Sequence, residues 1–311
     1  MPTIVSGESA HAPVANRAKA PSRRFSSVDP TMGANNNRHP LDAQGFEAFA
    51  GLALPAPAPG PPAPSRAVSE LTFGPPAAAP MAAAPGQPVE VPDTTVYPWR
   101  ANAFLKIQVP GRSEIFTGTG WFVGPYAVIT AAHAVFIRES GGYVGWASQI
   151  EVVPGQNGTG DEPFGNSLST AFQCPQGWQS DGDDRVDYGV ILLAQGLGST
   201  VGTFGYSTFS DSDILSAVAN LGGYPAVPPP PGEPPGRQWF TAGNILQVDD
   251  YFVYYQLATA PGDSGAAVYR NIGNNSYVMA IHTSASGTQN RGVRITGPIF
   301  DNIQQWASMH A

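Results

Sequence analysis

Cysteine, lysine and long apolar runs are scarce in this 311-residue chain, and each scarcity excludes a class of protein. The single cysteine, Cys174, excludes an intramolecular disulfide, so the fold must be held by its core. Lys106 is the only lysine after residue 90, and residues 91–311 carry nine basic against seventeen acidic side chains. Phosphate binding needs clustered Lys and Arg, and a membrane span needs a long apolar run. We therefore expect neither nucleic acid nor a membrane as a partner.

Proline is abundant and concentrated in the first part of the chain. Of the 32 prolines, 17 lie in residues 1–92, many of them in runs such as LPAPAPGPPAP at 54–64. Proline fixes φ and removes a hydrogen-bond donor, and the alanines around it bury little area. We predict that residues 1–90 are a disordered Pro/Ala-rich segment and that residues 91–311 form one well-packed domain. The first 30 residues show no standard secretory signal, because no apolar run follows their basic positions.

Short apolar runs separated by Gly, Asn, Asp and Pro begin near residue 96. They are rich in β-branched and aromatic residues, as strands are, and lie at 103–109, 120–124, 127–132, 188–193, 218–224, 251–257, 265–270 and 277–283. This spacing favours an all-β antiparallel barrel or sandwich over alternating βαβ units. Helical spacing appears only near the C-terminus, with one apolar face formed by Ile299, Phe300, Ile303 and Trp306. Thr296 is the candidate N-cap of this helix.

Three separated motifs together supply a nucleophile, a base and an acid. Ser264 lies in APGDSGAAV, a stretch that alone could be an ordinary small-residue turn. His133 follows the strand-like run VITAA, and Asp187 directly precedes the apolar run YGVILL. A serine hydroxyl needs a neutral imidazole to accept its proton, and that imidazole needs an acceptor on its other nitrogen. Gly262 has no side chain, so its N–H and that of Ser264 can face a developing oxyanion.

The motifs TAAH, DYGVILL and GDSG, in the order His–Asp–Ser, resemble the chymotrypsin-like serine proteases. Within them the chain looks most like the bacterial glutamyl endopeptidases, over a region from about Asp93 to Trp306. Further matching stretches are TTVYPWRA, TGTGWFVGP, VVPGQNGT, GTFGYS, AIHTSASG and NRGVRIT. The resemblance implies a chymotrypsin-like double antiparallel β-barrel with a C-terminal helix.

The same resemblance assigns a role to each candidate residue. His133 would be the general base, Asp187 its orienting acid and Ser264 the nucleophile, with the N–H groups of Gly262 and Ser264 forming the oxyanion hole. Asp183 and Asp184 compete with Asp187, but only Asp187 adjoins the apolar run as the family pattern requires.

Specificity for an acidic side chain also follows from the resemblance. Thr259 and His282 match the hydroxyl and the imidazole that bind the substrate carboxylate in glutamyl endopeptidases, and both groups can donate hydrogen bonds. Ala258 stands where a trypsin-like pocket has its acidic floor. We expect a serine endopeptidase that cleaves polypeptides after Glu, and less readily after Asp, through an acyl-enzyme. The alternatives are a triad protease with a small or apolar primary specificity, and a non-catalytic binding protein on the same fold.

Maturation and location are implied by the resemblance alone. It implies a secreted zymogen whose propeptide, residues 1–90, is cut between Glu70 and Val91; the alternative is a permanent disordered tail. We expect a monomer without a cofactor. Metal catalysis has no support, since no His, Cys or carboxylate cluster has ligand spacing. The sequence does not decide whether the domain binds a structural calcium ion.

Overall fold

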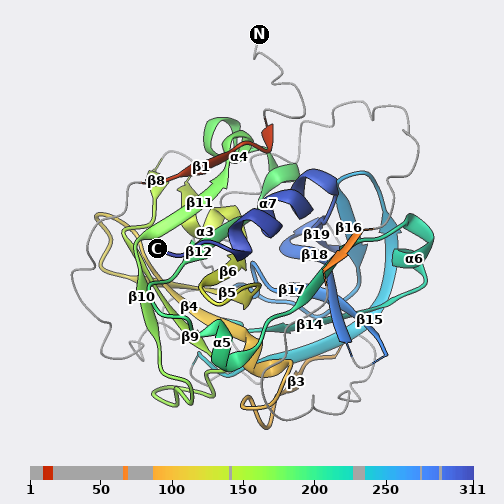
Figure 1. Ribbon diagram of the computed structural model, residues 1–311, viewed down its shortest axis with the longest axis horizontal. Coiled ribbons are helices and arrows are strands. Elements are labelled where there is room, and N and C mark those ends of the chain that lie inside the picture. Colours follow the sequence, from red (N-terminus) through yellow and green to blue (C-terminus); the bar gives the residue numbers. More distant parts are fainter. Residues whose placement is uncertain are drawn as a thin grey trace.

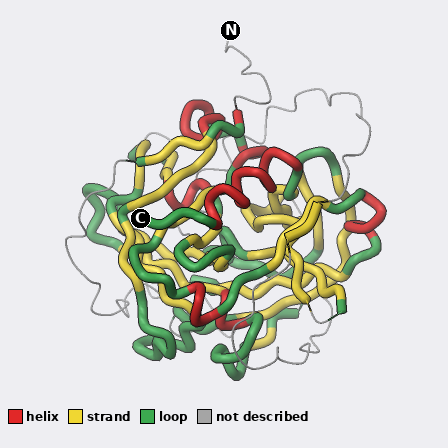
Figure 2. The backbone as a smooth tube through the Cα atoms, in the orientation of Figure 1, coloured by secondary structure: helices red, strands yellow, loops and turns green. Residues whose placement is uncertain are grey.

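The computed structural model describes residues 10–16, 66–68, 87–139, 142–226, 235–273, 275–286 and 289–311. Its strands form two large β-sheets, which we call the first and the second lobe (Figure 1). Strands dominate the backbone, and the helices between them are short, apart from the C-terminal one (Figure 2). The predicted all-β class is confirmed.

The first lobe is an antiparallel sheet with the strand order β11-β12-β6-β5-β4-β9-β10. Its strands are β4 (Asn102–Gln108), β5 (Ile115–Phe122), β6 (Ala127–Thr130), β9 (Gln149–Pro154), β10 (Ser167–Ser169), β11 (Ala171–Pro175) and β12 (Gly189–Leu192). Thr170 alone separates β10 from β11 in the chain, so the sheet must curl until its two ends meet. Apolar side chains of alternate residues, such as Leu105 and Ile107, fill the interior.

The second lobe closes into a barrel. Its strands are β14 (Val218–Gly223), β15 (Trp239–Val248), β16 (Phe252–Tyr255), β17 (Ala267–Ile272), β18 (Asn275–Ser286) and β19 (Gln289–Arg294). They follow the order β17-β14-β15-β16-β19-β18, and pairing of β17 with β18 completes the ring. A further strand, β13 (Gly205–Thr208), pairs in parallel with β18. Closure removes the exposed edges that an open sheet would present.

The C-terminal helix α7 (Gly297–Ala307) connects the two lobes. Its predicted apolar face is confirmed, since Ile299, Phe300, Ile303 and Trp306 are all buried. The indole N–H of Trp306 donates to Gln173 Oε1 of the first lobe at 2.9 Å, while the ring of Phe300 packs against Tyr206 on β13. Thr296 occupies the N-cap position, but its side chain makes no capping hydrogen bond.

Three stretches of the N-terminal segment are exceptions to its predicted disorder. Strand β1 (Pro13–Ala15) pairs with β11, β2 (Arg66–Val68) pairs with β13, and β3 (Val89–Glu90) pairs with β15. The composition of the segment does not reveal these pairings, because an extended chain can pair with unoccupied backbone groups of an existing strand. The other residues before Gln87 lie outside the described residues, so the propeptide and its boundary at residue 90 stay predictions.

Candidate active site

The pairing of two strands brings His133 and Asp187 together. Thr130, the last residue of β6, is directly opposite Gly189, the first residue of β12. The chain after β6 enters the one-turn helix α3 (Ala132–Val135), which contains His133. The chain before β12 leaves the 3₁₀ turn η3 (Asp184–Val186), and Asp187 is the residue that ends it. Both side chains therefore lie at the same edge of the first lobe.

Asp187 contacts His133 through both carboxylate oxygens. Oδ1 accepts the backbone N–H of His133 at 2.9 Å, and Oδ2 lies 2.8 Å from the ring nitrogen Nδ1. Asp187 is fully buried and His133 nearly so. A buried carboxylate is costly unless it is bonded, and here two partners offset its loss of water. With Nδ1–H donating to Asp187, the ring presents Nε2 as a proton acceptor.

The two competing aspartates have other partners. Asp183 accepts two hydrogen bonds from the guanidinium of Arg185, at 2.8 and 2.7 Å. Asp184 forms an ion pair with Arg291 at 2.6 Å. Of the three aspartates considered from the sequence, Asp187 is the one bonded to His133.

Ser264 lies in the loop between β16 and β17, and two glycines shape that loop. Gly262 has a φ of 99°, and a Cβ there would be 2.6 Å from the carbonyl oxygen of Tyr224. Gly265 has a φ of 88°, and a Cβ there would be 2.2 Å from Thr130 Oγ1. Neither position can carry a side chain without strain. Asp263 Oδ2 accepts the N–H of Ala260 at 2.9 Å, so Asp263 holds the turn.

Thr119, a fully buried residue of β5, fastens this loop to the first lobe. Its N–H donates to the carbonyl oxygen of Ser264 at 2.9 Å, and its hydroxyl donates to that of Gly262 at 2.8 Å. The same hydroxyl accepts the N–H of Tyr224 at 3.0 Å. Gly265 packs closely on Thr130 and Ala131, the residues that lead into α3. The loop that carries Ser264 is thus held against the segment that carries His133.

His282 lies on β18 beside the same loop. Its carbonyl oxygen accepts the N–H of Gly265 at 2.7 Å, and its own N–H donates to Ala266. The ring nitrogen Nδ1 is 2.7 Å from the hydroxyl of Tyr255, and both side chains are buried. Burial holds the pKa of Tyr255 well above its ordinary value, so the phenol stays neutral. A neutral hydroxyl can donate to Nδ1 or accept from it.

Thr259, the other predicted pocket residue, is half-buried and lines a cavity of about 220 Å³. The wall of this cavity is largely apolar and includes Pro88, Leu221, Trp239 and Phe240. His282 is not among the described residues that line it. The structure therefore places His282 against the nucleophile loop and Thr259 beside an apolar cavity next to that loop.

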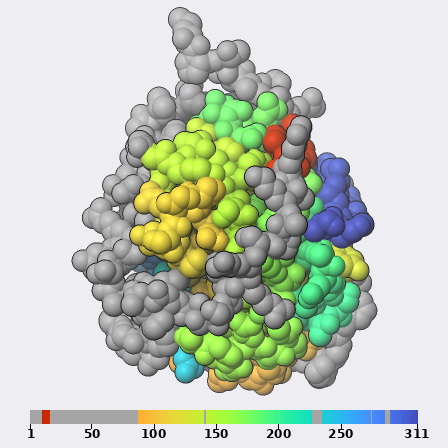
Figure 3. Space-filling model, turned by 90° about the vertical axis from the view of Figure 1, so that its left-hand side faces the viewer, coloured from red at the N-terminus to blue at the C-terminus, as the bar shows by residue number. Residues whose placement is uncertain are grey.

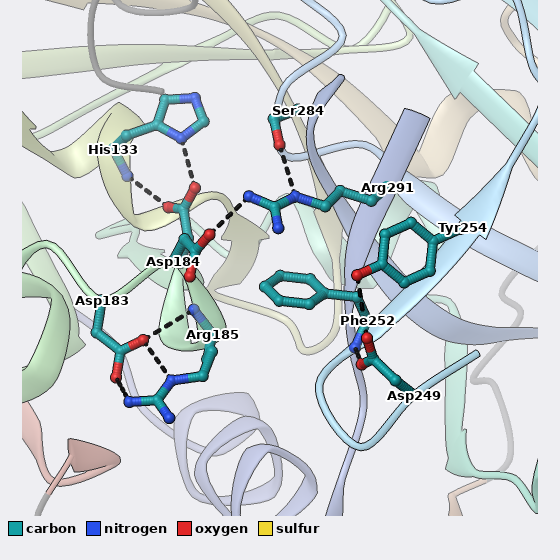
Figure 4. Close-up of polar contacts among 10 residues, drawn as sticks. His133, Asp183, Asp184, Arg185, Asp249, Phe252, Tyr254, Ser284 and Arg291 are labelled. Atoms are coloured by element: carbon teal, nitrogen blue, oxygen red, sulfur yellow. Dashed lines mark hydrogen bonds and ion pairs between the residues drawn. The ribbon is translucent and has the colours of Figure 1, made fainter. Parts of the chain in front are cut away.

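Sequence reasoning missed Thr119, Tyr255 and Arg291 near this site. Arg291 on β19 bonds Asp184 and, through Nε, Ser284 Oγ at 3.1 Å (Figure 4). Its guanidinium also lies 4.3 Å from the centroid of the Phe252 ring. Arg291 thereby connects the turn before Asp187 with the strand that carries His282. No spacing in the sequence pairs an arginine with an aspartate more than a hundred residues away.

The described residues offer no metal-binding group, no membrane-spanning helix and no reactive thiol. No group of three or more His, Cys, Asp or Glu side chains is arranged there to hold a metal ion. No helix there is long and apolar enough to cross a membrane. Cys174 is buried in the first lobe, and burial raises the pKa of its thiol, which keeps the sulfur protonated.

The chain is similar in sequence and in fold to known proteases, although no family model matches it. A protein named extracellular metalloprotease from Bacillus subtilis strain 168 is 34% identical over 219 residues, which are 70% of this chain and 67% of that protein. A glutamyl endopeptidase from Bacillus licheniformis is 35% identical over 224 residues, 70% of this chain and 66% of its own length. The chain thus spans about two thirds of these relatives. The solved structure of a Glu endopeptidase in complex with MPD has the same fold, with a TM-score of 0.60 and 23% identity over 73% of this chain and 98% of that chain.

Proposed function

Since the chain belongs to the bacterial glutamyl endopeptidases, a family of chymotrypsin-like serine proteases, we propose that it hydrolyses peptide bonds after Glu, and less readily after Asp. The proposed catalytic triad is Ser264, His133 and Asp187. The observation that supports it most is the doubly bonded Asp187–His133 pair, with the Ser264 loop held against the segment that precedes His133.

In the proposed mechanism each residue has one role. Ser264 Oγ attacks the scissile carbonyl while His133 Nε2 takes its proton. Asp187 holds the ring in the correct tautomer and stabilises the imidazolium that forms. The N–H groups of Gly262 and Ser264 face the oxyanion, and one such donor typically contributes about 2.7–4 kcal/mol. His133 then protonates the leaving amine, and water hydrolyses the acyl-enzyme.

Recognition of the substrate carboxylate is assigned to His282 and Thr259. When the Tyr255 hydroxyl donates to Nδ1 of neutral His282, the proton of that ring lies on Nε2 and can be donated to the substrate. When His282 is protonated, Nδ1–H donates to the phenol oxygen and Nε2–H donates to the carboxylate with added charge. Tyr255 thus supports both protonation states, and the hydroxyl of Thr259 supplies a further donor.

An apolar primary specificity is the second candidate, and one observation favours it. The cavity beside Thr259 is walled by Leu221, Trp239 and Phe240, which suit an uncharged side chain better than a carboxylate. Measurement of kcat/KM on peptides that differ only in Glu, Gln or Leu before the scissile bond separates the two candidates. A charge-assisted hydrogen bond contributes about 1.5–3 kcal/mol, so we expect Glu to exceed its isostere Gln by roughly ten- to a hundredfold.

Leu as the best substrate would overturn the glutamyl specificity and support the apolar alternative. A further outcome is that the correctly processed protein hydrolyses none of these peptides, just as its Ser264→Ala variant does. That result would favour a non-catalytic binding protein.

Secretion and zymogen processing complete the proposal. A relative at 34% identity is named as extracellular, and Pro88 lines the same cavity as Thr259, so a cut near this point would leave the new terminus close to the pocket. Mass spectrometry of the N-terminus of the purified, active protein tests this. A mature chain that starts between Glu70 and Val91 is expected, and an active protein in which residue 1 is still covalently joined to the domain would contradict processing.

A further inference from the structure

Residues 10–16 lie far upstream of the domain in sequence but form part of its surface. Strand β1 is antiparallel to β11, with Pro13 opposite Pro175, Val14 opposite Cys174 and Ala15 opposite Gln173. It is the outermost described strand of the first lobe. In Figure 3 this red segment lies at the surface beside the green residues of the first lobe. Without β1, β11 would present an open row of backbone groups.

The register of this pairing fits the sequence of both strands. The N–H of Asn16 donates to the carbonyl of Phe172 at 3.0 Å, and the N–H of Gln176 donates to that of Ala12 at 2.7 Å. Because bonded and non-bonded pairs alternate in an antiparallel ladder, Val14 and Cys174 form a bonded pair between them. Pro13 and Pro175 then face each other at a non-bonded pair, where the missing N–H of proline costs nothing. A shift by one residue would place a proline at a position that needs a donor.

Two side chains of the domain also bind the segment, and one side chain of the segment binds the domain. Asn302 on α7, only 9% exposed, donates through Nδ2 to the carbonyl oxygen of His11 at 2.8 Å and to the hydroxyl of Tyr188 at 2.7 Å. That hydroxyl lies 3.1 Å from Nδ1 of His11. Asn16 brackets the other end, since its Oδ1 accepts the N–H of Phe172 and its Nδ2 donates to the carbonyl of Thr170, each at 2.6 Å.

A buried amide that donates to the segment distinguishes this contact from casual packing. Burying a polar group is unfavourable unless it is bonded, so the position of Asn302 is matched to an extended chain at this place. Tyr188 directly follows Asp187, and it contacts both Asn302 and His11. The segment therefore braces the turn that carries Asp187 and the helix that joins the two lobes.

We infer that the open edge of β11, together with Asn302 and Tyr188, is a dedicated binding site for the extended segment of residues 10–16. The contacts are local to these seven residues, so the segment stays bound when the chain between it and the domain is cut. A single cut after residue 16 would then leave a two-chain protein, with the N-terminal fragment as a bound strand. The site requires no catalysis, and its test is independent of the proposed function.

The test uses the full chain with Ser264→Ala, so that no self-cleavage interferes. A recognition sequence for an unrelated, highly specific protease is inserted within residues 54–64, and the cut protein is analysed by size exclusion and native mass spectrometry. We expect the fragment that contains residues 10–16 to elute with the domain as a one-to-one complex. Elution of the fragment separately from a folded domain would overturn the inference, as would a complex that forms only between two copies of the chain.

A matched pair of proline variants tests the register. Val14→Pro removes a donor from a bonded position, so binding should weaken by about tenfold or more. Ala15→Pro changes a non-bonded position, whose N–H points away from β11, and should leave the complex nearly unchanged. Equal retention of both fragments, or loss of both to the same extent, would contradict the site as described. Because both changes lie outside the domain core, both proteins should fold.

Discussion

Replacement of Thr119 by valine tests how the nucleophile loop is held. Valine preserves the shape of threonine but removes the hydroxyl that donates to the carbonyl of Gly262 and accepts the N–H of Tyr224. Thr119 is fully buried, so water cannot take the place of the hydroxyl without rearrangement. A buried group that loses its partner costs about 1–3 kcal/mol, and two such groups cost about 2–6 kcal/mol. This is a large fraction of a typical stability of about 5–15 kcal/mol.

The assay combines unfolding with kinetics. Urea unfolding of Thr119→Val in a Ser264→Ala background should show the loss of stability without self-digestion. In the otherwise native enzyme, below its unfolding transition, kcat should fall by roughly ten- to a hundredfold, because a small displacement of the loop misplaces Ser264 and the oxyanion donors.

Thr94→Val provides the matched control. Thr94 is also buried, and its hydroxyl donates to the carbonyl of Gly155 at 2.6 Å and not to a residue of the nucleophile loop. Its loss should lower stability by about 1–3 kcal/mol and leave kcat unchanged. A folded Thr119→Val enzyme with native kcat would refute the reasoning that this hydroxyl positions the loop.

Further predictions concern the surroundings of the site and the bound segment. Arg291→Ala should lower kcat/KM by roughly tenfold, because the turn before Asp187 loses its partner on β19. A variant with native kcat/KM would show that the ion pair with Asp184 is dispensable. Tyr255→Phe should reduce the preference for Glu over Gln, since Nδ1 of His282 loses its hydroxyl partner, and an unchanged ratio in the peptide series would contradict this role. Binding of the cut N-terminal fragment should weaken as the pH falls below about 6.5. Burial lowers the pKa of His11 in the bound segment, so the released segment takes up a proton more readily than the bound one. The groups that act on His11 are Asp183, Arg185 and Tyr188, and equal fragment retention at pH 5 and pH 7.5 would contradict the prediction.

Local patterns in the sequence predict much of the fold. Runs such as 103–109 and 251–257 overlap strands β4 and β16, because their side chains suit a pleated and buried surface. The helix after Thr296 is equally visible, since its buried face repeats with helical spacing. Strand β15 was not predicted: its buried positions include Thr241 and Gly243 and its exposed positions include Leu246, so its apolar residues do not follow the alternation of burial.

The candidate site is predictable in its residues but not in its supports. His133, Asp187 and Ser264 lie in short motifs, whereas Thr119 and Arg291 act through partners more than a hundred residues away. Such contacts depend on how the strands pair, and no local pattern encodes that pairing.

Composition does not reveal the strand formed by residues 13–15. The prolines and alanines of the N-terminal segment indicate disorder, yet a strand edge binds an extended chain through backbone groups that composition does not reveal.

Labelling with a fluorophosphonate tests the central claim most directly, because the reagent reacts with a serine that a neighbouring base activates. Mass spectrometry of the processed protein should find one adduct, located on Ser264. His133→Ala should abolish the adduct while the protein remains folded. Absence of an adduct on Ser264 in the folded, processed protein, or labelling that persists in His133→Ala at the native rate, would contradict the account.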